Sequence, residues 1–185
     1  MHPKIEYTAF DDKEYQHILE KGRFSIPINL LLKYIFFVVI SLLTFSLFIA
    51  YAFQLEGRSF LYIALLRSAI GIAFIALFFF IISSFKRTFY FEKIKTRLDV
   101  DGNISTINDF FNFYKIENFP ETHHSNVFFA FEQKGRVRFE CTFICSQGNI
   151  LYNARPRDEG TINTSITLHM ARHMRKYFRK RGTKM

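Results

Sequence analysis

The sequence is poor in the residues that build cross-linked or repetitive proteins. Among 185 residues there are two cysteines, four prolines and eight glycines. Two cysteines cannot form the disulfide framework of a small secreted protein, and so little glycine and proline excludes a collagen-like repeat. Acidic residues are also scarce, with 16 against 25 lysines and arginines and a formal net charge of +9. Because 49 % of the residues are hydrophobic, a wholly disordered chain is excluded as well.

The hydrophobic residues are concentrated in two blocks, which excludes one soluble domain built from the whole chain. Residues 34–53 carry no charge, and residues 60–85 carry one, on Arg67. A helix of about 20 residues is ~30 Å long, which matches the hydrocarbon core of a bilayer. A helix also pairs its own backbone groups in lipid. We therefore expect a transmembrane helical hairpin over residues 28–85, with spans at about 30–53 and 60–85.

The distribution of lysine and arginine around these blocks predicts their orientation. Five such residues precede the first block, five follow the second within residues 86–97, and the connecting segment holds only Arg58. Basic residues favour the cytoplasmic side of a membrane. The sequence thus predicts a two-span protein of the inner (cytoplasmic) membrane with both termini in the cytoplasm.

Residues 1–27 are expected to form a cytoplasmic amphipathic segment. Asp11 or Asp12 can cap a short helix, Tyr15 and Ile18 share its apolar face, and Gly22 can end it. Such a helix could lie on lipid headgroups or dock on the C-terminal domain. Docking is favoured, because the segment has no cationic face.

Residues 86–185 are expected to fold into a small cytoplasmic domain of the α+β class. Residues 99–103 have the composition of a turn, and a helix is predicted from Ser105 to Asn118. A three-strand antiparallel meander follows, with strands beginning at Val127, Val137 and Ile150. A final basic helix is predicted from Thr164 or Ser165 to about Arg181. Helices flanking one such sheet give an α+β layer domain.

No group of residues in the sequence predicts catalysis or a cofactor. Cys141 and Cys145 lie on one face of a strand, ~13 Å apart, which is too far for a disulfide or a shared metal ion. His169 and His173 have the spacing of a zinc-binding helix, but the glutamate of H-E-x-x-H is missing. We therefore expect a non-enzymatic protein without a metal or other cofactor.

Two sets of residues remain candidates for interactions. In the second span, Arg67 is either a functional charge or an interfacial residue that reaches the headgroups. Three small side chains lie on one face of this span; these are Ala69, Ala73 and Ala76. They would allow close packing of the helix against the first span or against another subunit. The C-terminal helix carries six bases expected to contact an anionic surface; these are Arg172, Arg175, Lys176, Arg179, Lys180 and Arg181. Contact with anionic lipid headgroups and a tail that only fixes topology are the two favoured interpretations. An acidic partner protein also fits, and nucleic acid is less favoured.

Two functions follow as hypotheses. The first is a membrane-anchored adaptor or scaffold subunit of a larger inner-membrane assembly, whose cytoplasmic domain recruits a partner protein. The alternative is a self-assembling pore or membrane-disrupting effector, gated by the cytoplasmic domain. The sequence leaves open whether the oligomer contains one kind of subunit or several.

Overall fold

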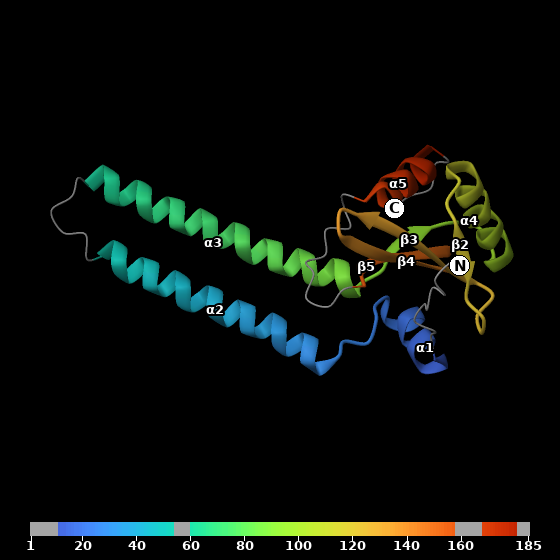
Figure 1. Ribbon diagram of the computed structural model, residues 1–185, viewed down its shortest axis with the longest axis horizontal. Coiled ribbons are helices and arrows are strands. Elements are labelled where there is room, and N and C mark those ends of the chain that lie inside the picture. The colour runs from blue at the N-terminus through green and yellow to red at the C-terminus, as the bar shows by residue number, and fades with distance from the viewer. Residues whose placement is uncertain (1–10, 54–59, 158–167, 181–185) are drawn as a thin grey trace. The chain divides into compact units, whose positions relative to one another are not determined.

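The computed structural model describes residues 11–53, 60–157 and 168–180 (Figure 1). The chain divides into two compact units, which are described separately. One is Ile26–Lys86, called the hairpin below. The other combines Met1–Ser25 with Arg87–Met185 and is called the head domain. The head domain is therefore built from both sides of the hairpin.

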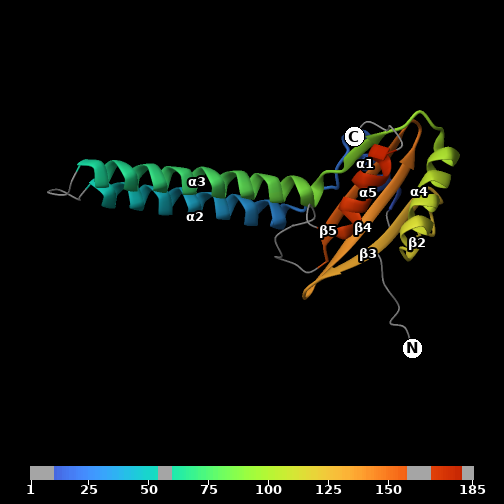
Figure 2. The ribbon, with the colours of Figure 1, turned by 90° about the horizontal axis from the view of Figure 1, so that it is seen from above.

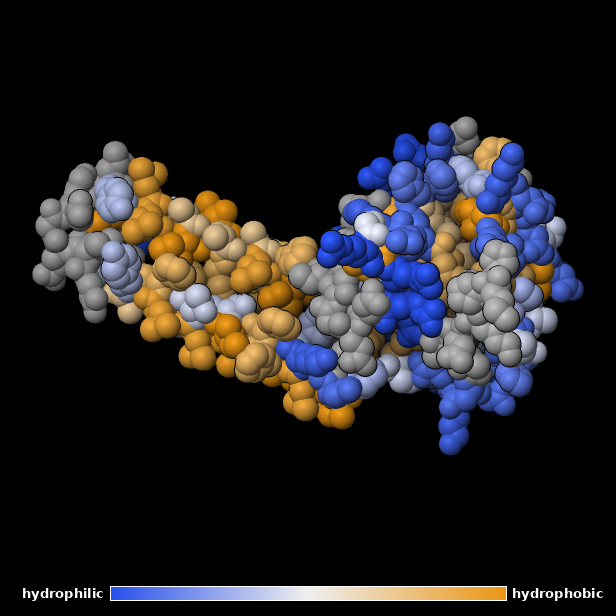
Figure 3. Space-filling view, in the orientation of Figure 1, coloured by the Kyte–Doolittle hydropathy of each residue, from blue (hydrophilic) through white to orange (hydrophobic). Residues whose placement is uncertain are grey.

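The hairpin consists of two long apolar helices, α2 (Ile28–Phe53) and α3 (Phe60–Phe89), of which the residues from Arg87 onward already belong to the head domain. Both are long and apolar enough to cross a membrane, and the rest of the chain does not bury them. Hydrophobic residues cover the hairpin in Figure 3, whereas hydrophilic residues predominate on the visible face of the head domain. The sequence predicts both helices, but α3 continues four residues beyond the expected end at residue 85. No proline or glycine interrupts it there.

The two helices of the hairpin pack side by side. The half-buried residues of α2 recur at alternating spacings of three and four; they are Leu31, Tyr34, Val38, Ser41 and Phe45. This is the pattern of helices packed nearly along each other. Phe45 stacks on Phe74 of α3, with ring centroids 4.2 Å apart, and Tyr34 meets Phe85 edge-on at 5.0 Å.

The head domain contains a five-stranded antiparallel sheet with strand order β1-β5-β4-β3-β2. Its strands are β1 (Glu92–Lys95), β2 (Asn118–Pro120), β3 (Val127–Lys134), β4 (Val137–Ser146) and β5 (Asn149–Pro156). The predicted meander is the centre of this sheet. The two edge strands are additions, with four and three residues. Strands this short contain too few residues for the alternation of hydrophobic and polar side chains to reveal them.

Two helices, α4 (Val100–Tyr114) and α5 (His169–Lys180), cover one face of the sheet. The core between them is aromatic and includes Phe110, Phe111, Phe143 and Phe178. Cys141 and Cys145 lie in the same core, on the face predicted for them. The apolar residues of α5 at helical spacing are buried in this core; these are Met170, Met174, Tyr177 and Phe178. The predicted cap at Thr164 or Ser165 lies outside the described residues.

The predicted bounds of α4 are wrong at both ends. The helix begins at Val100 rather than Ser105, because the Asp99 carboxylate accepts a hydrogen bond of 2.8 Å from the Gly102 backbone N–H. The polar run that looks like a turn is therefore a capped first helical turn. The helix ends at Tyr114 rather than Asn118, and Lys115 follows in the left-handed conformation with φ of 51°.

The helix α1 (Asp12–Lys21) covers the opposite face of the sheet, as Figure 1 shows. Asp11 caps its start and Gly22, with φ of 66°, ends it, as predicted. Ile18 and Phe24 are buried in this layer. Thr142 lies on this face, opposite the aromatic core, and is buried too. This face of the sheet is thus a second interface, on which α1 packs, as predicted for the N-terminal segment.

The chain segments that flank the hairpin are paired with each other. Phe24 N–H donates to the Phe89 carbonyl at 2.8 Å, and Phe91 N–H donates to the Gly22 carbonyl at 2.9 Å. The side-chain amide of Asn153 on β5 donates to the carbonyls of Arg87 and Tyr90, at 3.1 and 2.8 Å. We call residues 22–24 with 89–91 the exit ribbon. The ribbon brings the chain before α2 and the chain after α3 to one place in the head domain.

Candidate interaction surfaces

A pocket of about 330 Å³ opens between α4, α5 and the β2–β3 edge of the sheet. Its lining combines aromatic, apolar and charged side chains; they include Tyr114, Lys115, Glu117, Phe119, Phe131 and His173. A volume of this size is at the lower end of the range for small-ligand sites. It can hold one side chain of a partner protein or a small molecule.

Stacked rings form part of the pocket lining. The imidazole of His173 lies on the ring of Tyr114, with centroids 4.1 Å apart and planes 10° from parallel. Phe119 and Phe131 come from neighbouring strands, with their rings 5.9 Å apart. Aromatic pairs of this kind are stiff and bury a large apolar area. The pocket therefore offers a preformed apolar surface beside charged groups.

Glu132 holds the start of α5 in place beside this pocket. Its carboxylate accepts hydrogen bonds from the backbone N–H groups of His169 and Met170, at 2.6 and 2.8 Å. The carboxylate satisfies two of the donors that every helix leaves open at its N-terminus. Glu132 is thus a cap supplied by a distant strand.

The two histidines of α5 do not form a recognisable metal centre. Their ring centroids are 6.2 Å apart, and His173 is stacked on Tyr114. Among the described residues, no group of three or more His, Cys, Asp or Glu side chains is placed to hold a metal ion.

The predicted basic residues of α5 have different surroundings. Arg172, Lys176 and Arg179 are exposed at i, i+4 and i+7, so they share one side of the helix. Arg175 instead binds Glu92 of β1, with 2.6 Å between nitrogen and oxygen. Lys180 is the last residue of α5, and Arg181 lies outside the described residues. The structure therefore brings three of the six together on an exposed face and uses a fourth to join α5 to the sheet.

The predicted small-residue face of α3 is not the face that packs on α2. Ala69, Ala73 and Ala76 are exposed, whereas neighbours such as Ile70 and Phe74 are half-buried. Arg67 is also exposed on α3.

The cysteines are free thiols without access to solvent. Burial raises the pKa of Cys145 to about 12. Burial also raises the pKa of Cys141, against a weak opposing hydrogen bond from the Tyr152 hydroxyl 3.8 Å away. Both thiols are therefore protonated near neutral pH, and a thiolate nucleophile or metal ligand is not available at either position.

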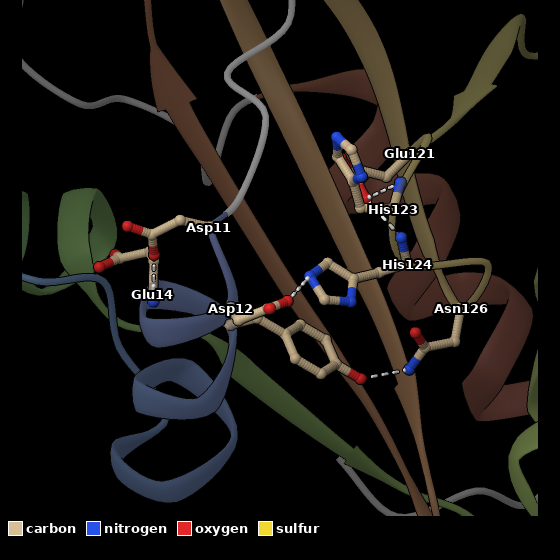
Figure 4. Close-up of polar contacts among 8 residues, drawn as sticks. Asp11, Asp12, Glu14, Glu121, His123, His124 and Asn126 are labelled. Carbon is tan, nitrogen blue, oxygen red and sulfur yellow. Dashed lines mark hydrogen bonds and ion pairs between the residues drawn. The ribbon is translucent and has the colours of Figure 1, made fainter.

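A polar cluster that holds α1 on the sheet could not be predicted from the sequence. His124 stacks on the Tyr15 ring at 4.0 Å, and its Nε2 lies 3.5 Å from the Asp12 carboxylate. The side-chain amide of Asn126 donates to the Tyr15 hydroxyl at 2.7 Å (Figure 4). The Glu121 carboxylate fixes this loop by accepting from the backbone N–H groups of His123 and His124, at 2.8 and 2.5 Å. In the sequence, only the adjacent histidines His123 and His124 draw attention to this loop. Tyr15 and Asn126 are 111 residues apart in the chain, so their contact could not be read from it.

No protein family model, no curated protein and no solved structure matches this chain.

Proposed function

We propose that the protein is a membrane-anchored adaptor: the hairpin crosses the inner membrane and the head domain recruits a partner protein on the cytoplasmic side. One observation carries the proposal. The polar segments on both sides of an apolar hairpin fold into a single domain that offers a preformed pocket. A chain arranged in this way holds one binding domain at a fixed point on a membrane.

The arrangement of the head domain limits the topology of the hairpin. The exit ribbon joins residues 22–24 to residues 89–91, so a hairpin in a bilayer must begin and end on one side. The excess of lysine and arginine on both flanks supports the cytoplasm as that side. As part of the same proposal, the adaptor is a subunit of a larger assembly in the inner membrane.

Purification in mild detergent tests recruitment directly. The full chain should co-purify with another protein at a fixed ratio, as measured by native mass. Exchanging the two exposed charges at the pocket, Lys115→Glu with Glu117→Lys, should abolish that capture because it reverses the local field without changing net charge. The matched control exchanges two exposed charges on α1, Lys13→Glu with Glu20→Lys, and should retain the partner. Isolation of the unaltered chain as a lone monomer would contradict the proposal.

A self-assembling membrane pore is the second candidate, and the exposed alanine face of α3 favours it. Ala69, Ala73 and Ala76 leave room for close approach of another α3 helix. Replacing Ala73 by Leu should then reduce a homo-oligomer to smaller species, and Arg67→Leu should change the conductance of reconstituted membranes. If Ala73→Leu leaves the number of subunits in the complex unchanged, this function is excluded.

A further inference from the structure

The exposed side of α5 carries basic residues in one row. Arg172, Lys176 and Arg179 are exposed at i, i+4 and i+7, and we call them the basic face of α5. Residues four apart on a helix are separated by ~6 Å along its axis, so these side chains are neighbours. Figure 2 looks onto this side of the head domain, with α5 in front of the strands. The basic face therefore points away from the sheet.

Two carboxylates that contact α5 are already committed. Glu92 binds Arg175, with 2.6 Å between nitrogen and oxygen. Glu132 accepts two backbone hydrogen bonds at the start of the helix. Among the residues that the structure describes, no carboxylate pairs with the basic face. In the sequence, α5 contains no acidic residue, and residues 181–185 add two bases and no acid. The positive charge of the basic face is thus available to a partner.

The basic face adjoins the pocket. His169 and His173 line the pocket, and Arg172 and Lys176 follow them by three residues each. Residues three apart are neighbours on a helix surface. A ligand that enters the pocket can therefore continue across α5 and meet the basic face.

An exposed aromatic side chain stands beside the same pocket. Phe113 of α4 is 70 % exposed, and its ring centroid lies 4.9 Å from that of Tyr114, which lines the pocket. Most of the apolar area of this phenylalanine remains in water within the head domain, and contact with a partner would remove it from water. The apolar margin of the pocket thus favours a peptide segment as the ligand, since a small molecule inside the pocket would leave Phe113 exposed.

We propose that the pocket and the basic face of α5 together bind an extended acidic segment of the partner protein. One apolar side chain of the segment occupies the pocket, and carboxylates beside it bind Arg172, Lys176 and Arg179. Side chains two apart in an extended chain point the same way and are ~6.6 Å apart, close to the ~6 Å between residues four apart on α5. Charge complementarity of this kind speeds association and selects the partner. The inference rests on the partner recruitment proposed above and names the chemistry of that partner.

Nucleic acid matches this surface less well. The two exposed charges on the pocket, Lys115 and Glu117, have opposite signs, so the positive charge is confined to α5. Binding of nucleic acid without base-specific contacts depends mainly on the number of phosphates that are neutralised. A single row of three bases neutralises few of them.

A peptide selection tests the chemistry of the ligand. The full chain in mild detergent is the bait for displayed random peptides of about 12 residues, which at ~3.3 Å per residue can cross both the pocket and α5. The recovered peptides should be rich in Asp and Glu around one aromatic or long aliphatic residue. A synthetic copy should bind about ten-fold more weakly when that residue becomes alanine, and salt at ~1 M should also weaken binding, because the Debye length falls to ~3 Å.

Two charge-reversal variants locate the binding surface. Arg172→Glu with Lys176→Glu should weaken binding of the acidic peptide by about ten-fold or more. The matched control is Lys93→Glu with Lys95→Glu on β1, which has the same change of net charge and should bind within about two-fold of the unaltered chain. Both lysines are exposed and flank Ile94, which points into the core beneath α4 and α5, so they lie on the opposite face of the sheet.

A neutral variant keeps the test independent of folding. Arg172→Gln with Lys176→Gln removes the two charges without reversing them and should give an intermediate loss of binding. Only exposed side chains change in these variants, so their near-UV circular dichroism should equal that of the unaltered chain.

Three outcomes would overturn the proposal. They are selected peptides without an excess of acidic residues, equal loss of binding in the α5 and β1 variants, and binding of polyuridylate RNA through the basic face when no acidic peptide binds. The last outcome would make this face a nucleic-acid site. A partner that co-purifies and is retained by Arg172→Glu with Lys176→Glu would leave the adaptor standing and overturn the acidic segment. A lone monomer that still binds acidic peptides through α5 would overturn the adaptor alone, so the two proposals fail separately.

Discussion

At the scale of single residues, an ion pair between β4 and β5 lies where the sheet meets the N-terminal layer of the head domain. Arg155 binds the buried Glu140 carboxylate, and its guanidinium also lies 4.2 Å from the centroid of the Phe24 ring. One side chain therefore neutralises a buried charge and covers the ring of Phe24. Removing one partner of such a pair is much more costly than removing both.

Arg155→Met should accordingly destabilise the head domain by about 3–5 kcal/mol, because it leaves Glu140 buried and unpaired. The double variant Glu140→Met with Arg155→Met should recover most of that loss. Thermal unfolding in detergent, followed by near-UV circular dichroism, measures both. Equal destabilisation by the single and double variants would show that the loss comes from packing on Phe24 and not from the charge.

The buried thiols give the protein a predictable response to alkaline pH. The pKa of Cys145 rises from 9.0 to about 12, so the folded protein holds this proton more tightly than the unfolded chain does. The resulting stability is fully present below pH 9 and is lost as the pH rises toward 12. Over that range the unaltered protein should lose on the order of 1 kcal/mol per pH unit more than Cys145→Ala. Denaturant unfolding at several pH values measures this difference, and parallel curves would contradict it.

At the scale of elements, the sequence predicted those with a regular apolar pattern and missed those set by polar contacts. The two long helices follow from long apolar blocks with almost no charge, and the central meander follows from the alternation of apolar and polar residues. The start of α4 does not, because it depends on the Asp99 carboxylate accepting from Gly102. The basic face of α5, formed by Arg172, Lys176 and Arg179, could be predicted from helical spacing, whereas the pocket could not be predicted. Its lining comes from three separate regions of the chain.

The helix α5 should depend on Glu132 although that residue lies on another element. Glu132→Ala removes the acceptor for two backbone N–H groups and should cost about 1–2 kcal/mol, the usual value of a helix cap. Faster amide hydrogen exchange should appear at His169 and Met170 before the rest of the helix. Glu132→Gln keeps an acceptor and should retain part of the protection, so equal exchange in the two variants would contradict the capping role.

At the scale of the whole molecule, the head domain is discontinuous in sequence, and this predicts the result of a topology experiment. Lys13 and Arg97 lie on opposite sides of the hairpin in the chain but in the same folded unit. Cysteines placed at these two positions should show the same accessibility to a membrane-impermeant thiol reagent in intact cells. Both should react only after the membrane is permeabilised, if that unit is cytoplasmic. Labelling of only one in intact cells would contradict the common side.

The pairing of the exit ribbon also sets an order of events during synthesis. The helix α1 is made first, yet Tyr15 must wait for Asn126, 111 residues later, before its hydroxyl finds a partner. At 5–20 residues per second that delay is roughly 6–22 seconds. Both apolar helices leave the ribosome within this interval, so they can enter a bilayer while α1 is still undocked. Closure of the head domain then ties the two ends of the hairpin together, and the completed fold preserves whichever side the hairpin entered from.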